Sequence, residues 1–329
     1  MMKNQKAVEH IVSTANLKKY YRVKGSFLSP GGSIVKAVDS VDLNIKMGET
    51  LGLVGESGCG KSTLGQLILK LEDPSEGQVF FRGEPITGRS PRTLERLRRE
   101  IQVIFQDPIA SLNPRRTVES ILLDPFVIHH LGTKMERQKW IVELLDSVEM
   151  SEEALKRYPH EFSGGQRQRI CIARALALNP AFVVCDEVTS ALDVSIQAQI
   201  LNLLMKLQTR LQLTYLFISH NLNVVKHISD RVAVMYLGRI IEIARVNELM
   251  GEQVHPYTAA LLYANPDPDP FQEKEKIILQ GEIPSAIDPP AGCHFHPRCP
   301  RRLPICDKQV PELKEYEAGH FVRCFLFDE

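Results

Sequence analysis

Residues 55–62 read GESGCGKS, which fits the pattern G-x-x-x-x-G-K-[ST] and decides the fold. The run before it, TLGLV (50–54), is typical of a buried parallel strand, and STLGQLILKL (62–71) after it has apolar residues at helical spacing. Glycines let backbone N–H groups point at phosphate oxygens, and the N-terminal end of a helix attracts negative charge. The order of strand, loop and helix therefore predicts a phosphate-binding loop.

The side chains of this loop predict particular contacts with a nucleotide. Lys61 is expected to reach the β- and γ-phosphates, and the Ser62 hydroxyl to ligate Mg²⁺. The complete expected contact set is Gly55, Glu56, Ser57, Gly58, Cys59, Gly60, Lys61, Ser62 and Thr63. An ordinary glycine-rich turn is the alternative, and the strand and helix on either side favour the phosphate loop.

A second buried-strand pattern, AFVVCDE (181–187), ends in two carboxylates. Ligands of α/β sheets bind at such strand ends. We expect Asp186 to be a partner of Mg²⁺, directly or through water, and Glu187 to orient or deprotonate the attacking water. The alternative is a strand that simply leaves the core through two acids.

A further anion site is indicated by Ser163, Gly164 and Gly165, which precede a helical pattern beginning with Gln166 (166–178). A serine cap followed by two glycines exposes unpaired N–H donors at a helix start. Alone, this pattern is better explained as a plain helix start. Together with the two patterns above, it predicts a second contact with the γ-phosphate.

These motifs resemble those of ATP-binding-cassette (ABC) ATPases, and IFQDP (104–108), SALD (190–193) and FISHN (217–221) extend the resemblance over most of residues 10–245. It implies an α/β fold: a P-loop NTPase (RecA-like) core with an N-terminal antiparallel β subdomain and an inserted helical subdomain. A C-terminal cysteine-containing extension would follow.

The resemblance also implies roles for residues that would be unremarkable alone. Gln106 would sense the γ-phosphate, join the Mg²⁺ ligands and contact a membrane partner, and Asp193 would bridge to a second subunit. His220 would hold the γ-phosphate and orient Glu187. Tyr21 is placed like the aromatic residue that stacks on adenine, although a half-buried strand tyrosine is an equal alternative.

Two positions depart from the family pattern. Val188 stands where proline is usual after Glu187, and Asn221 stands where aspartate is common after His220. Neither position supplies a phosphate or metal ligand, so hydrolysis should survive.

In this family the Ser-Gly-Gly turn closes over the phosphate loop of a partner cassette, with ATP between two chains. One copy of each motif here therefore implies a second, paralogous ATPase subunit, and a heterodimer is expected. ATP would hold the two subunits together, and hydrolysis would release them.

The composition suits a cassette docked on a membrane. Forty Lys plus Arg balance forty Asp plus Glu in 329 residues, which argues against a general nucleic-acid-binding surface. The charged segment RTLERLRRE (92–100) is interpreted as a solvated helix face. No apolar stretch approaches the length of a membrane span, and MMKNQKAVEH (1–10) lacks the apolar core of a signal peptide. We expect a peripheral protein on the cytoplasmic face of the membrane.

The motif order predicts three domains. Residues 1–105 and 177–250 would form the nucleotide-binding core with its β subdomain, 106–176 the helical signature subdomain, and 251–329 the extension. Further expected elements are helices over 135–150 and 195–211, a strand over 214–220, an apolar strand pair over 231–244, a loop over 25–32 and a linker over 265–270.

The extension gathers four of the seven cysteines, Cys293, Cys299, Cys306 and Cys324. A cytosolic chain does not usually keep disulfides, so four clustered thiols suggest thiolate ligation of a metal, although their spacings are not those of a common zinc ribbon. On chemistry alone, zinc, an iron–sulfur cluster and unligated thiols stay open. The remaining cysteines, Cys59, Cys171 and Cys185, are interpreted as small packed side chains.

The segments HPYTAALL (255–262), QGEIPSAIDPPAGC (280–293) and FHPRC (295–299) resemble the C-terminal extension of oligopeptide and dipeptide importer ATPases, and LKKYYRVKG (17–25) resembles their F-type subunit. The resemblance implies a [4Fe–4S] cluster on the four cysteines, with a structural or regulatory role. His294 and His296 are spare candidates, although loop histidines are more often solvated.

This resemblance implies an ATPase subunit that powers two membrane permeases and is served indirectly by an extracytoplasmic solute-binding protein. The alternatives are an importer for nickel or another small solute and, from a different class, a non-transport ABC ATPase.

Overall fold

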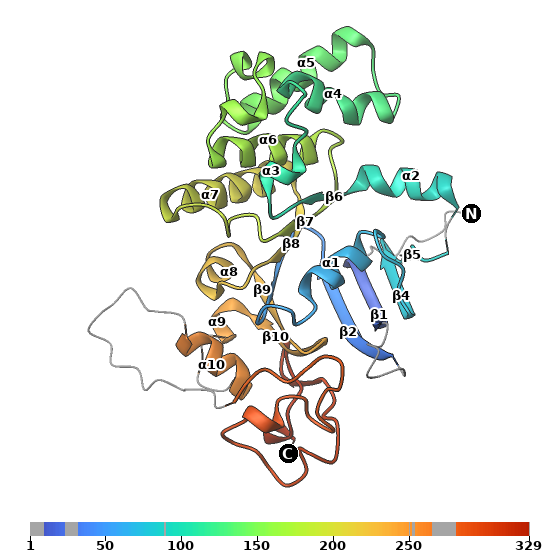
Figure 1. Ribbon diagram of the computed structural model, residues 1–329, viewed down its shortest axis with the longest axis vertical. Coiled ribbons are helices and arrows are strands. Elements are labelled where there is room, and N and C mark those ends of the chain that lie inside the picture. The colour runs from blue at the N-terminus through green and yellow to red at the C-terminus, as the bar shows by residue number, and fades with distance from the viewer. Residues whose placement is uncertain are drawn as a thin grey trace. The chain divides into compact units, whose positions relative to one another are not determined.

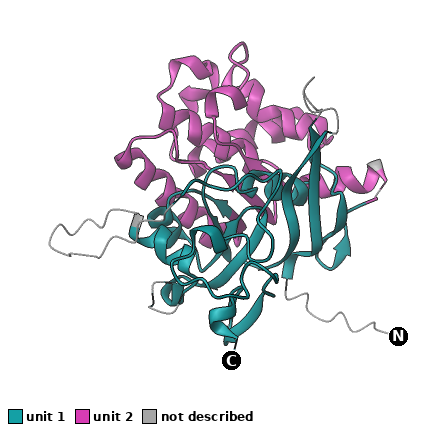
Figure 2. Ribbon diagram, turned by 60° about the horizontal axis from the view of Figure 1, so that its bottom comes forward, with its two compact units in different colours: residues 1–87, 217–329 teal, residues 88–216 magenta. Residues whose placement is uncertain are grey.

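The computed structural model describes residues 10–23, 32–88, 90–249, 251, 254–264 and 281–328 (Figure 1). The chain forms two compact units (Figure 2). Unit 1 comprises residues 1–87 and 217–329, and unit 2 comprises residues 88–216. The predicted linker over 265–270, most of the predicted loop over 25–32 and residues 1–9 lie outside the described residues.

Unit 1 contains the N-terminal strands, the first predicted loop and the C-terminal extension. Its strands are β1 His10–Val23, β2 Ser33–Lys46, β3 Thr50–Val54, β4 Glu76–Phe81, β5 Glu84–Pro85, β9 Arg231–Tyr236, β10 Arg239–Arg245, β11 Lys314–Glu317 and β12 His320–Val322. Its helices are α1 Lys61–Ile68, α8 Leu222–Ile228, α9 Val246–Leu249, α10 Pro256–Ala264 and the 3₁₀ turns η3 His296–Arg298 and η4 Phe325–Phe327.

Four of these strands form an antiparallel sheet in the order β2-β1-β4-β5. The long β1–β2 pair starts with His10 opposite Lys46 and ends with Val23 opposite Ser33, and several bulges interrupt its register. Bulges bend and twist a strand pair, which fits two strands of this length. This sheet confirms the predicted antiparallel β subdomain.

A second, mixed sheet of unit 1 carries the predicted phosphate loop. β3 pairs in parallel with β9, and β9, β10, β12 and β11 continue the sheet with antiparallel pairs. Every residue of β3 is buried, as expected for a parallel strand covered on both faces. The observed strand Thr50–Val54 has the predicted bounds, and α1 follows the loop directly.

Unit 2 contains the helical region. Its helices are α2 Pro91–Glu100, α3 Pro108–Ser111, α4 Val118–Ile128, α5 Lys134–Ser147, η1 Glu152–Lys156, η2 Pro159–Glu161, α6 Gly164–Leu176 and α7 Val194–Leu211. Its strands are β6 Ile101–Ile104 and β7 Phe182–Asp186, and β8 Thr214–Ile218 begins in this unit and ends in unit 1.

The helices of unit 2 begin where their sequences provide caps. Thr133 and Glu136 form a reciprocal capping box at the start of α5, and Thr117 caps α4. β6 and β7 pair in parallel, from Ile101 opposite Phe182 to Ile104 opposite Cys185. The parallel pairs in both units confirm the predicted α/β P-loop class.

The predicted elements agree with the observed ones to within a few residues at their ends. The charged segment 92–100 lies within α2, whose described side chains are exposed or half-buried, as predicted. None of the helices in the described ranges is both long and apolar enough to cross a membrane.

Candidate functional site

The loop after β3 has the backbone geometry of a tight cradle. Gly60 stands immediately before α1 with φ of 108°, and a Cβ there would lie 2.0 Å from the carbonyl oxygen of Ala37. Both the positive φ and the close approach require glycine. Lys61 begins the helix and is buried, and its Nζ donates to the carbonyl oxygens of Gly55 at 2.8 Å and Glu56 at 3.0 Å. The ammonium group is therefore held inside the loop.

The other loop residues divide into exposed and packed side chains. Ser62 is exposed on the first turn of α1, and Thr63 is half-buried. Cys59 is buried, and burial raises the pKa of its thiol. Burial likewise raises the pKa of Cys171 to about 11 and the pKa of Cys185 well above its ordinary value. These three cysteines are packed side chains, as predicted, and their thiols are weakly acidic.

His220 lies at the end of β8. The Ser219 N–H donates to the carbonyl oxygen of Leu53 at 3.1 Å, so the chain enters His220 beside the end of β3. The His220 side chain is exposed. Asn221 caps α8, because its Oδ1 accepts hydrogen bonds from the N–H groups of Asn223 and Val224. Asparagine here performs the capping that an aspartate could also perform.

Tyr21 is half-buried on β1, opposite Val35 of β2. The ammonium group of Lys19 lies 5.0 Å from the centre of its ring, which is a cation–π contact. The stacking role of Tyr21 stays a prediction.

In unit 2 the structure brings together two predicted catalytic residues. Glu187 follows β7 with φ of 47°, an uncommon conformation for a residue other than glycine. The Gln106 amide Nε2 donates to Glu187 Oε2 at 2.9 Å. Val188 is buried and replaces the usual proline with an apolar side chain. Asp186, the last residue of β7, lines a cleft of about 700 Å³ together with Gln106.

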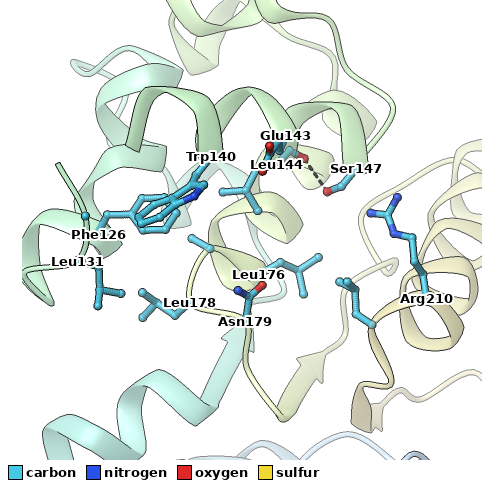
Figure 3. Close-up of a pocket in the computed structure, with 13 residues that line it drawn as sticks. Phe126, Leu131, Trp140, Glu143, Leu144, Ser147, Leu176, Leu178, Asn179 and Arg210 are labelled. Atoms are coloured by element: carbon cyan, nitrogen blue, oxygen red, sulfur yellow. Dashed lines mark hydrogen bonds between the residues drawn. The ribbon is translucent and has the colours of Figure 1, made fainter. Parts of the chain in front are cut away.

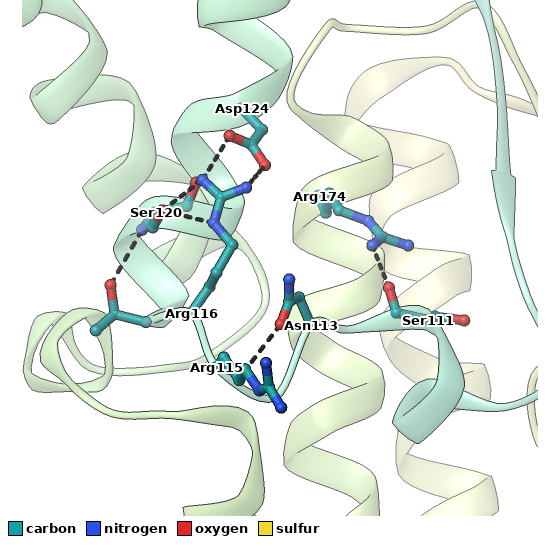
Figure 4. A network of polar contacts seen from close by, with 8 residues as sticks. Ser111, Asn113, Arg115, Arg116, Ser120, Asp124 and Arg174 are labelled. Atoms are coloured by element: carbon teal, nitrogen blue, oxygen red, sulfur yellow. Dashed lines mark hydrogen bonds and ion pairs between the residues drawn. The ribbon is translucent and has the colours of Figure 1, made fainter.

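A polar network orders the segment after Gln106 (Figure 4). The Arg116 guanidinium pairs with both carboxylate oxygens of Asp124 and donates to the Ser120 hydroxyl. Arg174 on α6 donates to the carbonyl oxygen of Ser111. Fixed bidentate pairing gives an arginine–carboxylate contact geometric specificity. The segment 111–124 is therefore tied both to itself and to α6.

The Ser163 turn starts α6 with a reciprocal capping box. Ser163 Oγ accepts from the Gln166 N–H at 3.4 Å, and Gln166 Oε1 accepts from the Ser163 N–H at 3.1 Å. Gly165 packs closely, since a Cβ there would lie 2.5 Å from Ile196 Cγ2. Ser163 and Gly164 are exposed. Asp193 stands at the start of α7 and is also exposed.

Unit 2 also contains a pocket that no predicted site residue lines. It has a volume of about 370 Å³ and lies between the α5 face carrying Trp140 and Leu144 and the ends of α6 and α7 (Figure 3). The rings of Phe126 and Trp140 pack with their centres 5.1 Å apart. No sequence motif predicts this pocket, because its lining residues come from four separate stretches of chain.

Among the described residues, the four C-terminal cysteines do not form the predicted metal site. Cys306 and Cys324 are buried, and the Cys293 N–H donates to the carbonyl oxygen of Cys306 at 2.8 Å. Burial and, to a smaller extent, the Cys293, Cys299 and Cys306 thiols raise the pKa of Cys324 to about 12, so the four lie in one region. However, the described residues include no group of three or more His, Cys, Asp or Glu arranged to hold a metal. The structure therefore does not support the predicted [4Fe–4S] cluster.

Sequence reasoning missed two contacts of the phosphate loop itself. Glu56 pairs with Arg298, and its backbone N–H donates to the Tyr257 hydroxyl. Both partners lie in segments that the sequence marked only by resemblance, HPYTAALL and FHPRC.

Comparison with known proteins places this geometry in a family. The ABC transporter family matches residues 38–190, and the C-terminal region of oligopeptide/dipeptide transporters matches residues 241–306. The chain is 51% identical to the oligopeptide transport ATP-binding protein AppF of Bacillus subtilis over 97% of its own length and 98% of that protein. It is 54% identical to the putative oligopeptide transport ATP-binding protein YkfD of the same organism, over 89% of its length and 90% of that protein.

Two solved structures of ABC proteins are similar to this chain in fold and in sequence. The ATP-binding cassette MJ0796, in a dimeric post-hydrolysis state bound to ADP and Pi, matches with a TM-score of 0.63 and 32% identity over 71% of this chain and 98% of that one. The cbiO1 protein of Clostridium perfringens, part of an ABC transporter complex, matches with a TM-score of 0.64 and 27% identity over 74% of this chain and 92% of that one.

Proposed function

This chain belongs to the ABC transporter family of ATP-binding proteins, and from that membership we propose that it binds and hydrolyses ATP to power an importer of di- and oligopeptides. The observation that carries the proposal is the loop between β3 and α1, which encloses the Lys61 ammonium group at the start of a helix. Such a loop presents backbone donors and one fixed cation to a triphosphate.

Nucleotide binding is assigned to the residues around this loop. Lys61 exchanges its hydrogen bonds to the loop carbonyls for bonds to the β- and γ-phosphates, and Tyr21 stacks on the adenine. Ser62, Asp186 and Gln106 would hold Mg²⁺, since hydroxyl, carboxylate and amide oxygens are ligands that suit this hard cation. Bound Mg²⁺ neutralises charge that develops on the β- and γ-phosphate oxygens.

Hydrolysis is assigned to Glu187, Gln106 and His220. The oxygen of a water molecule attacks the γ-phosphorus, the bond to the bridging oxygen of ADP breaks, and Glu187 accepts the water proton. Support comes from the hydrogen bond of 2.9 Å between Gln106 and the Glu187 carboxylate, which would hold the base in place. His220 would contact the γ-phosphate and orient Glu187.

Catalysis is proposed to need a second cassette. The turn formed by Ser163, Gly164, Gly165 and Gln166 would close over the loop of a partner subunit, and Asp193 would lie at that interface. Exposure of Ser163 and Gly164 supports this role, as does the dimeric state of the related cassette MJ0796. We infer that the partner is a second, paralogous ABC ATPase subunit, which makes the assembly a heterodimer.

The proposed assembly sits at a membrane. Two permease subunits would receive the motion of the cassettes, and the chain would lie peripherally on the cytoplasmic face, served indirectly by a solute-binding protein. Peptide is favoured over nickel or another solute because the AppF and YkfD relatives are described as oligopeptide transport proteins. The division of labour follows the predicted domains, with the core in 1–105 and 177–250, the signature subdomain in 106–176 and the extension in 251–329.

A [4Fe–4S] cluster on Cys293, Cys299, Cys306 and Cys324 is a separate hypothesis that no step above uses. The shared location of the thiols supports it, and the lack of a metal-holding group among the described residues opposes it. Chain purified without oxygen should be brown and contain iron and acid-labile sulfide. A colourless sample with stoichiometric zinc would refute the cluster.

Two variants test the ATPase assignment. Lys61→Ala should lose ATP binding, whereas Glu187→Gln should keep ATP, trap the dimer and lose roughly 10³-fold in turnover, as a missing general base does. Equilibrium ATP binding and phosphate release measure the two effects, and normal turnover in both variants would refute the roles. Recovery of permease subunits with the chain in mild detergent would separate a transporter from a non-transport ATPase.

A further inference from the structure

The C-terminal extension contacts the phosphate loop through a buried tyrosine. Tyr257 on α10 is fully buried, and its hydroxyl oxygen accepts the backbone N–H of Glu56 at 2.9 Å. Burial raises the pKa of Tyr257 far above its ordinary value, so the hydroxyl stays neutral. Its ring packs against Tyr236 and Phe295, with ring centres 4.7 and 5.4 Å apart. The second residue of the loop is therefore hydrogen-bonded to a rigid aromatic cluster.

A second contact joins the same residue by its side chain. Arg298 Nη1 donates to Glu56 Oε2 at 2.9 Å and Arg298 Nη2 donates to Glu56 Oε1 at 3.1 Å. The Arg298 side chain is only 8% exposed and that of Glu56 23% exposed, so water screens the pair little. Two parallel charge-assisted bonds fix the carboxylate in distance and direction.

The extension itself is anchored to the core by a buried carboxylate. Glu242 on β10 is fully buried and accepts from the Thr258 hydroxyl, from the His255 N–H and from His320 Nε2 at 2.8 Å. These contacts tie α10 and β12 to β10. The hydroxyl of Tyr257 is thus carried by a helix that is fixed at its first turn.

The position of Glu56 matters for the chemistry of the loop. Its carbonyl oxygen accepts from Lys61 Nζ, so the backbone that holds Lys61 is also the backbone that Tyr257 holds. Its carboxylate is an anion inside a loop that is to receive a polyanion, and an unpaired carboxylate there would repel phosphate. Arg298 neutralises it.

We propose that the C-terminal extension is a brace for the phosphate loop, in which Arg298 and Tyr257 are positioning residues that set the affinity for ATP. The inference rests on the proposed function of the loop as an ATP site, and it assigns to the extension a part in nucleotide binding that needs no metal.

The test measures equilibrium binding of Mg·ATP and steady-state ATPase kinetics on the full chain. Arg298→Ala should weaken ATP binding about tenfold, because the Glu56 carboxylate then leaves an unpaired negative charge on the phosphate loop. The loss should appear as a raised KM for ATP with kcat at saturating ATP little changed. Arg298→Lys keeps the charge but not the bidentate geometry. Its ATP affinity should lie between those of the wild type and of Arg298→Ala.

A double-mutant cycle separates this role from general stability. In a Glu56→Gln background, Arg298→Ala should cost less than about threefold in ATP affinity, since no carboxylate is left to neutralise. Arg302→Ala is the matched control, because Arg302 pairs with Asp307 at 2.6 Å in the same extension and, among the described residues, forms no hydrogen bond or ion pair with the loop. It should leave ATP affinity at the wild-type value.

The outcomes are distinct. Equal ATP affinity of Arg298→Ala and wild type, or an equal loss in both Glu56 backgrounds, would overturn the brace while leaving the ATPase assignment intact. A wild-type chain that binds no ATP would contradict the proposed function, and the brace with it. Melting temperatures measured without nucleotide check folding, and if Arg298→Ala does not fold, Arg298→Lys carries the same comparison.

Discussion

The two glycine turns that start α1 and α6 look alike in sequence but are supported differently. The loop before α1 depends on distant chain: Ala37 crowds Gly60, and Tyr257 and Arg298 hold Glu56. The turn before α6 is held largely by itself, through the reciprocal hydrogen bonds between Ser163 and Gln166. The first turn is enclosed by other parts of the chain, whereas the second keeps Ser163 and Gly164 exposed.

This difference fits the proposed roles of the two turns. A loop that grips ATP within its own chain benefits from contacts that fix it before the ligand arrives, because preorganised groups lose less entropy on binding. A turn that is completed by the nucleotide on a partner subunit must stay exposed, so local capping is its main support. The comparison predicts that substitutions around Gly60 destabilise distant parts of the fold, whereas substitutions around Ser163 affect only the start of α6.

The largest effect should come from an added methyl group in the braced loop. Gly60→Ala places a Cβ 2.0 Å from backbone oxygen at a positive φ, and should lower the free energy of unfolding by about 3 kcal/mol or more. Gly165→Ala is the control, because its Cβ meets the side chain of Ile196 rather than backbone and φ is not positive. Denaturant unfolding compares them, and equal losses would erase the proposed difference between the turns.

Lowering the pH should have an intermediate effect on stability, through histidines of the extension. Burial lowers the pKa of His255 to about 3, and neutral His255 Nδ1 accepts the Tyr257 N–H at 3.1 Å. This pKa lies below the value of 6.5 that His255 has in the unfolded chain. The contribution of neutral His255 to the stability of the fold is therefore present above pH 6.5 and is lost as the pH falls toward 3. His294, with its pKa lowered to about 4, acts in the same direction. The melting temperature should therefore fall between pH 6.5 and 4.

Two histidine variants check the sign of this dependence. His255→Asn keeps a hydrogen-bond acceptor that does not titrate in this range, so its melting temperature should fall less steeply with acid. His320 behaves oppositely: its hydrogen bond to Glu242 raises its pKa, so its contribution is present below pH 6.5 and is lost as the pH rises through the raised value. His320→Asn should therefore cost more at pH 6 than at pH 9. An unchanged acid slope in His255→Asn would contradict the assignment.

The smallest effect is expected at the self-supported turn. Ser163→Ala removes the side-chain acceptor for the Gln166 N–H and should cost about 1 kcal/mol in the free energy of unfolding. Ser163→Asn, which can still cap, should recover most of that loss. Thermal or denaturant unfolding measures both. A loss as large as that of Gly60→Ala would mean that this turn, too, supports distant structure.

Most of the elements could be predicted because their signals are local. TLGLV is apolar except for Thr50 and forms the buried strand β3 with the predicted bounds, and Ser163 with Gln166 predicts the start of α6. Element ends shifted by a few residues, as with α5, where Thr133 and Glu136 fix the start of the helix at Lys134. No sequence pattern predicts the pocket beside Trp140, since it forms only when separate helices pack together.

By itself, the sequence determined the fold class, the family and the two turns that are proposed to meet phosphate, because glycine spacing, caps and apolar runs act over a few residues. Only the tertiary structure decided what holds the first turn in place. Glu56 and Arg298 are 242 positions apart, and no local pattern links a carboxylate to an arginine at that separation. Their pairing depends on β10, through Glu242, bringing the extension back onto the core.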